Sequence, residues 1–185
     1  YPNITNKVKV FLRYIDEIFI IWTGNLTGLK NFLKDLNNQH ESIKFDYSIS
    51  KKSVAFLDTL VYIDDKNLLQ TTLYRKETDR QNFLHKQSEH PHSLKKSIPY
   101  SQTLRIKRIC STKSDFEQQC HDLKEKFIQR GYSATEVQEQ INKASRIGRE
   151  ELLLEASTRK NHDRIPLVLP YNRTTPKISN IINKH

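Results

Sequence analysis

The stretch RYIDEIFIIW places two adjacent carboxylates, Asp16 and Glu17, inside a run of bulky apolar residues. Neighbouring carboxylates supply the oxygen ligands that hard divalent cations prefer. Acids in a turn between strands also keep that turn soluble, and the residues by themselves leave both interpretations open. The β-branched and aromatic residues on either side predict a strand, a tight turn and a second strand. The two acids are therefore expected at the tip of a hairpin.

Six histidines and cysteines between residues 85 and 121 raise the question of a zinc site or a nucleophile. They are His85, His90, His92, Cys110, Cys120 and His121. Their spacing fits no compact set of zinc ligands, so a metal site there is disfavoured. A Cys–His nucleophile formed by Cys120 and His121 is also disfavoured, because Cys120 lies on a predicted apolar helix stripe.

Basic side chains gather in the middle of the chain. The formal net charge is +10, and residues 75–113 contain 10 basic and 3 acidic residues. The candidate contacts to a polyanion are Arg75, Lys76, Arg80, Lys95, Lys96, Arg105, Lys107 and Arg108. A solvated helix face remains the alternative, but their grouping favours a groove that follows the phosphates of a nucleic acid.

The elements of the first half must position the two acids. Apolar residues at helical spacing predict an amphipathic helix from Leu29 that ends near Asn37–Asn38. Three strand-like runs follow at residues 43–50, 53–63 and 68–76, the last two joined by the polar turn 64–67. A sheet of antiparallel strands with a helix on one face is the simplest assembly.

The second half is predicted to be helical. In the segment that ends at Cys110, Ile106, Ile109 and Cys110 share one face, and Arg105, Lys107 and Arg108 lie on the opposite arc.

Two further helices are predicted from capping boxes. The first opens with Ser114 as N-cap and Glu117 three residues later, and the second opens with Ser133 and Glu136. The apolar stripe of the first is formed by Phe116, Cys120, Leu123 and Phe127, and that of the second by Val137, Ile141 and Ala144. Gly131 suits the left-handed position between them, so the pair predicts a helical hairpin.

With these elements in place, the chain resembles the latter palm and the thumb of Penelope-like retroelement reverse transcriptases. The residues that carry the resemblance are FLRYIDEIFIIWTG, FLDTLVYI, LYRKETDRQNFLHKQSEHPHSLKKSIPYSQTLRIKRICS and FIQRGYSATEV, in consistent order over residues 9 to about 150. The resemblance implies an α+β fold with three parts. Residues 1–75 would be part of the palm, residues 76–160 a helical thumb with a helix-turn-helix-like hairpin, and residues 161–185 a basic linker.

The resemblance also implies roles for the turn residues. Asp16 matches a metal-binding aspartate, so that Mg²⁺ would be the cofactor of the complete enzyme, and Tyr14 matches a tyrosine beside the nucleotide and the primer end. Glu17 departs from the second aspartate of the family, and the extra methylene displaces its carboxylate. Phe56 and Leu57 match the hairpin near the primer grip.

The implied function is an RNA-directed DNA polymerase fragment that binds an RNA template and a DNA primer. The chain has no methionine and few residues before the turn. We therefore expect a piece of a longer protein, inactive alone because the fingers and an earlier palm aspartate are missing. A GIY-YIG endonuclease is an expected downstream partner. The alternative is a non-catalytic nucleic-acid-binding helix-turn-helix module, and a protein-interaction scaffold is a third reading. No apolar run approaches the roughly 18 residues of a membrane span, so we expect an intracellular protein, acting in the nucleus if the resemblance holds.

Overall fold

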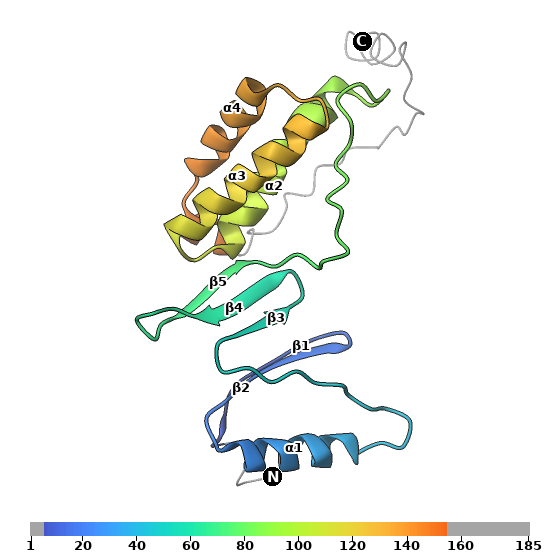
Figure 1. Cartoon of the computed structure of the whole chain (residues 1–185), viewed down its shortest axis with the longest axis vertical. Helices are drawn as coiled ribbons and strands as arrows, with labels where there is room; N and C mark the ends of the chain where they lie inside the picture. Colours follow the sequence, from blue (N-terminus) through green and yellow to red (C-terminus); the bar gives the residue numbers. More distant parts are fainter. Residues whose placement is uncertain (1–5, 155–185) are drawn as a thin grey trace, which may run out of the picture. The chain divides into compact units, whose positions relative to one another are not determined.

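The structure is a computed structural model, and it describes residues 6–154 of the 185-residue chain. The fold class is α+β, as predicted, with two small antiparallel sheets and a helical second half (Figure 1). The chain divides between Tyr74 and Arg75 into two compact units, which are described separately below. The predicted basic linker, residues 161–185, lies outside the described residues.

The first unit opens with the predicted hairpin. Strand β1 (Val8–Tyr14) pairs antiparallel with β2 (Glu17–Trp22), and Tyr14 is the partner of Glu17. The loop is therefore the two residues Ile15 and Asp16. The predicted strand–turn–strand is confirmed, because the β-branched and aromatic residues of both strands suit a pleated ladder.

Helix α1 (Leu26–Asn37) follows, and it ends where the sequence predicts. The side chain of Asn25 caps its start by accepting a hydrogen bond from the Gly28 N–H at 2.8 Å. Phe32 on this helix stacks on Trp22 of β2 with ring centroids 5.7 Å apart, and Leu33 is buried. The apolar side of α1 thus packs against the hairpin.

A second sheet of three strands completes the first unit. Its strands are β3 (Ser53–Phe56), β4 (Thr59–Ile63) and β5 (Leu69–Leu73), in the order β3-β4-β5. The predicted single run over residues 53–63 is wrong, because a two-residue turn at Leu57 and Asp58 splits it into two paired strands. The expected single sheet is also wrong, since β1 and β2 form a sheet of their own.

The predicted strand over residues 43–50 does not form either. The side-chain amide of Asn37 takes the place of a neighbouring strand there. It accepts from the Phe45 N–H at 2.6 Å and donates to the Phe45 carbonyl at 3.0 Å. Because both backbone groups of Phe45 are paired in this way, this residue needs no hydrogen bonds from a neighbouring strand.

The second unit contains four helices within the described residues: α2 (His92–Ile109), α3 (Lys113–Gln129), α4 (Ala134–Ser145) and α5 (Arg149–Leu153). Helices α2, α3 and α4 pack against one another, and α5 packs on α2 (Figure 1). Most of the buried apolar side chains of the described residues lie here: Ile106, Cys110, Cys120, Leu123, Phe127, Tyr132, Val137, Ile141 and Ala144. The predicted stripes of α3 and α4 thus form one core, except that Phe116 of the α3 stripe is only half-buried.

The capping boxes need correction. Thr112, not Ser114, is the N-cap of α3, and its hydroxyl accepts from the Asp115 N–H at 3.1 Å. Ser133 is the N-cap residue of α4 as predicted, but its side chain makes no capping hydrogen bond. Its hydroxyl instead lies 2.7 Å from the Thr135 hydroxyl.

Candidate nucleic-acid interface

The turn of the first hairpin presents Asp16 to solvent. Ile15, the first loop residue, has a φ of 53°, a region in which β-branched residues are rare and strained. The guanidinium of Arg13 donates to the Ile15 carbonyl at 2.9 Å and braces the turn. Within the described residues, the exposed carboxylate of Asp16 makes no hydrogen bond or ion pair. Tyr14 beside it is 57% exposed.

Glu17 is placed differently from Asp16. Its Oε2 accepts a hydrogen bond from the Leu57 N–H at 3.0 Å, in the β3–β4 turn. Leu57 has a φ of 55°, so the Glu17 carboxylate stabilises a second turn that contains a strained residue. Phe19 and Phe56 pack nearby with ring centroids 5.6 Å apart. Glu17 therefore has a structural role that the sequence did not indicate.

The two acids fit a metal ion only in part. Asp16 has both carboxylate oxygens available for Mg²⁺, whereas Glu17 has one oxygen engaged at Leu57. Within residues 6–154, no three His, Cys, Asp or Glu side chains lie close enough together to hold a metal ion. Mg²⁺ often binds one or two carboxylates together with substrate phosphates, so Asp16 would be its ligand here.

The cysteines of the second unit do not suit nucleophilic chemistry. Cys120 is buried in the helical core, and this burial raises the pKa of its thiol to about 12. A thiol with so high a pKa supplies almost no thiolate near neutral pH.

The α3–α4 hairpin turns at Gly131, as predicted. Its φ of 81° is a left-handed conformation that glycine adopts without strain. Behind the turn, Phe127 is fully buried between two rings, stacked on Phe83 at 4.5 Å and edge-on to Tyr132 at 5.0 Å. The aromatic cluster connects the hairpin to the segment that precedes α2.

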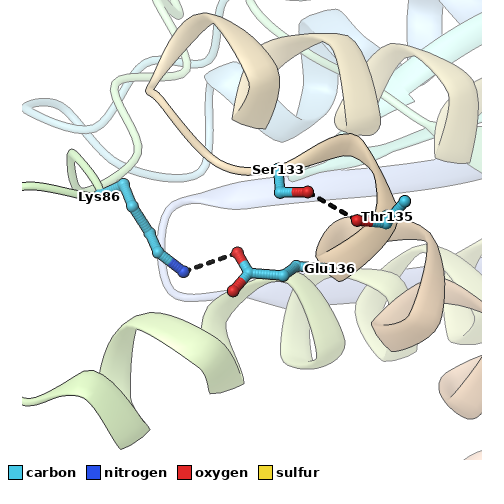
Figure 2. A network of polar contacts seen from close by, with 4 residues as sticks. All are labelled: Lys86, Ser133, Thr135 and Glu136. Carbon is cyan, nitrogen blue, oxygen red and sulfur yellow. Dashed lines mark hydrogen bonds and ion pairs between the residues drawn. The ribbon is translucent and has the colours of Figure 1, made fainter.

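That preceding segment, residues 82–88, crosses the turn of the hairpin, and we call it the strap. The Lys86 N–H donates to the Arg130 carbonyl at 3.0 Å, and the Arg130 guanidinium donates to the Phe83 carbonyl at 2.7 Å. Figure 2 shows the third link, in which Lys86 Nζ lies 2.7 Å from Glu136 Oε2 at the start of α4. The hydrogen bond from Lys86 is the main reason that the pKa of the Glu136 carboxyl is lowered.

Arg75, Lys95 and Lys107, three of the eight predicted basic contacts, interact with other groups of the second unit. Arg75 is half-buried and donates to Gln119 Oε1 at 2.6 Å, and Lys95 Nζ donates to the Ser88 carbonyl at 2.8 Å. The ammonium of Lys107 lies 4.6 Å from the centre of the Phe116 ring. These three side chains hold the unit together, and burial lowers the pKa of Arg75.

The other five predicted contacts are exposed: Lys76, Arg80, Lys96, Arg105 and Arg108. Three of them lie on α2, so the structure brings part of the predicted set onto one helix. Sequence reasoning missed Lys86 of the strap and Arg130 at the end of α3, because their partners are about fifty residues away and no local pattern reveals them.

Comparison with known proteins found one similarity, which lies in this part of the chain. Residues 82–142 match the animal helix-turn-helix domain. The match covers about a third of the chain, from the strap through α2 and α3 to most of α4. No similar curated protein and no similar solved structure was found. A helix-turn-helix domain is compatible with nucleic-acid binding, the coarser part of the predicted function. Among the helices of residues 6–154, none is both long and apolar enough to cross a membrane.

Proposed function

We propose that the second unit is a nucleic-acid-binding helix-turn-helix module without catalysis of its own. The observation that carries the proposal is the match over residues 82–142, whose helices α2, α3 and α4 pack around one core. Helix-turn-helix domains bind nucleic acid through a helix that the rest of the bundle supports. The excess of basic over acidic residues in 75–113 supplies the attraction.

A binding measurement tests this function. The full chain is titrated into a fluorescein-labelled DNA duplex of random sequence, and fluorescence anisotropy is followed at several salt concentrations. We expect affinity to fall steeply between about 50 and 200 mM salt, because each phosphate contact releases counterions. A protein-interaction scaffold would show no salt-dependent affinity, and that result would refute the proposal.

A second candidate is part of an RNA-directed DNA polymerase, which would bind an RNA template and a DNA primer. It is favoured by the strained turn that projects Asp16 beside an exposed Tyr14. Asp16 would then hold Mg²⁺, which supplies Lewis-acid stabilisation in phosphoryl transfer. The complete enzyme would also contain the fingers and a palm strand with an earlier aspartate, and a GIY-YIG endonuclease would be its downstream partner. Either candidate would act in the nucleus.

Primer extension by the chain alone would establish the second candidate. The full chain is incubated with an RNA template, a DNA primer, deoxynucleotides and Mg²⁺, beside the Asp16→Ala variant. We expect no extension by either protein. Extension by the wild type that Asp16→Ala abolishes would establish the polymerase and contradict a module without catalysis.

A further inference from the structure

We infer that the second unit holds the phosphate backbone of a nucleic-acid duplex on the exposed face of α2, and not on the second helix of the α3–α4 hairpin. The inference rests on the proposed nucleic-acid-binding function and specifies its surface and its ligand.

The charges of the three packed helices differ sharply. Helix α2 contains five basic residues and no acidic residue, whereas α3 contains three basic and four acidic residues, and α4 one basic and two acidic residues. A polyanion is therefore attracted to α2 and gains nothing from the other two helices.

One face of α2 is suited to a phosphate chain, and we call it the α2 ridge. Its residues recur every three or four positions and are all exposed: Ser93, Ser97, Ser101, Arg105 and Arg108. Residues at this spacing line one side of a helix, here over roughly 22 Å, which corresponds to about six base pairs of duplex. Short serine side chains let a phosphate chain approach the helix closely, and the exposed, positively charged side chains of Arg105 and Arg108 attract its phosphates.

The start of α4 is unsuited to the same task. In helix-turn-helix proteins the first residues of the second helix reach the base edges. Here those positions include Glu136 and Glu139, both exposed carboxylates. Glu136 is also paired with Lys86 at 2.7 Å (Figure 2). Carboxylates at this point would repel the phosphates on both sides of a groove.

The aromatic side chains of the unit favour a duplex over a single strand. Proteins that bind single strands stack the bases on accessible aromatic rings. In the described residues 75–154, no Phe or Tyr side chain is exposed, and there is no Trp. Phe83, Phe127 and Tyr132 pack together, while Phe116 and Tyr100 lie beneath the ammonium groups of Lys107 and Lys143. The unit thus has a cationic ridge and no stacking platform.

Three double variants of the full chain test the assignment of the face. Each removes two positive charges, so that all have the same net charge: Arg105→Gln with Arg108→Gln on α2, Lys113→Gln with Lys126→Gln on α3, and Lys143→Gln with Arg146→Gln at the end of α4. Affinity for a short random-sequence DNA duplex and for one of its strands is measured by anisotropy at several salt concentrations. Far-UV circular dichroism checks that each variant is folded.

We expect the α2 variant to lose about tenfold or more in duplex affinity at low salt, and its salt slope to fall by about 1.8 for two lost phosphate contacts. The α3 and α4 variants should change affinity by less than about threefold. Arg105→Lys with Arg108→Lys, which keeps both charges, should recover most of the affinity and remains informative if the glutamine variant is poorly folded.

Two results would overturn the inference: an α4 variant that loses as much affinity as the α2 variant, or tighter binding of the single strand than of the duplex. Absence of any binding by the wild type is a distinct result, which would refute the proposed function together with the inference.

Discussion

At the scale of single residues, the aromatic cluster of Phe83, Phe127 and Tyr132 forms the centre of the core behind the α3–α4 turn. Phe127 has no exposed surface and contacts both Phe83 and Tyr132. The Tyr132 hydroxyl is buried and has no hydrogen-bond partner within the described residues. Burial also raises the pKa of this hydroxyl. The ring therefore stabilises the core, and the hydroxyl carries an uncompensated desolvation cost.

Tyr132→Phe is accordingly expected to leave stability unchanged or to raise it by up to about 1 kcal/mol, because it removes the unpaired hydroxyl and keeps the ring. Urea unfolding followed by circular dichroism measures the change. As a control, Phe127→Ala should lower the free energy of unfolding by about 3–5 kcal/mol, since it leaves a cavity in the core. A loss above about 1 kcal/mol for Tyr132→Phe would mean that the hydroxyl has a partner.

At the scale of elements, the strap makes the packing of helices α2, α3 and α4 depend on residues that precede α2. Lys86 and Arg130 join the strap to the turn of the hairpin, and Lys86 holds Glu136 at the start of α4. The family match begins at residue 82, so the strap belongs to the matched domain. Lys86 thus bonds the same Glu136 carboxylate that interacts with the Ser133 backbone at the start of α4.

The Lys86–Glu136 pair predicts a pH dependence. The folded pKa of Glu136 is lowered from its ordinary value of 4.5. The pair therefore stabilises the fold above that value, and this contribution disappears as pH falls through the folded pKa. Glu136→Gln should cost about 0.5 kcal/mol near neutral pH at low salt, as exposed ion pairs do, and almost nothing in acid.

Urea midpoints of wild type and Glu136→Gln, compared at neutral and at acidic pH, measure that contribution. The same substitution in a Lys86→Gln background is the control, because the main cause of the lowered pKa is then absent. Equal effects of Glu136→Gln with and without Lys86 would show that the pair contributes nothing.

At the scale of the whole molecule, the two units differ in how well each is packed. Leu33 and Leu73 are the buried apolar residues of the first unit within residues 6–74, whereas nine lie in the second. The first unit also leaves large side chains such as Phe11 and Ile15 exposed. Since burial of apolar surface is the main source of stability, most of it is expected in the helical unit.

Separate fragments should therefore behave differently. A fragment of residues 75–154 is expected to remain helical and to melt cooperatively, while residues 1–74 should show a broad, weak transition, because small domains with few buried residues are marginal. Circular dichroism melting curves of the two fragments measure this. A sharp transition for residues 1–74 alone would contradict the expectation.

The local elements of this protein follow from sequence, since capping residues, glycine positions and apolar spacing act over a few residues. The first hairpin, the end of α1, the turn at Gly131 and the buried stripes of α3 and α4 were all predictable in this way. The pairing across the turn at residues 64–67 was also predictable, but the division of residues 53–63 into two strands and the separation of the strands into two sheets were not, because a ladder needs a partner that local patterns do not specify. Residues 43–50 have the composition of a strand, but the side chain of Asn37 bonds both backbone groups of Phe45 there. Leu57 takes a left-handed conformation that its residue type disfavours.

The candidate sites show the same division. Sequence alone placed Asp16 at a hairpin tip and concentrated basic residues around α2. Only the tertiary structure decided that Glu17 is engaged at Leu57, that Arg75, Lys95 and Lys107 are held by other groups, and that Lys86 pairs with Glu136. The physical reason is that charge and periodicity are properties of a segment, whereas the availability of a side chain depends on neighbours that folding brings from elsewhere in the chain.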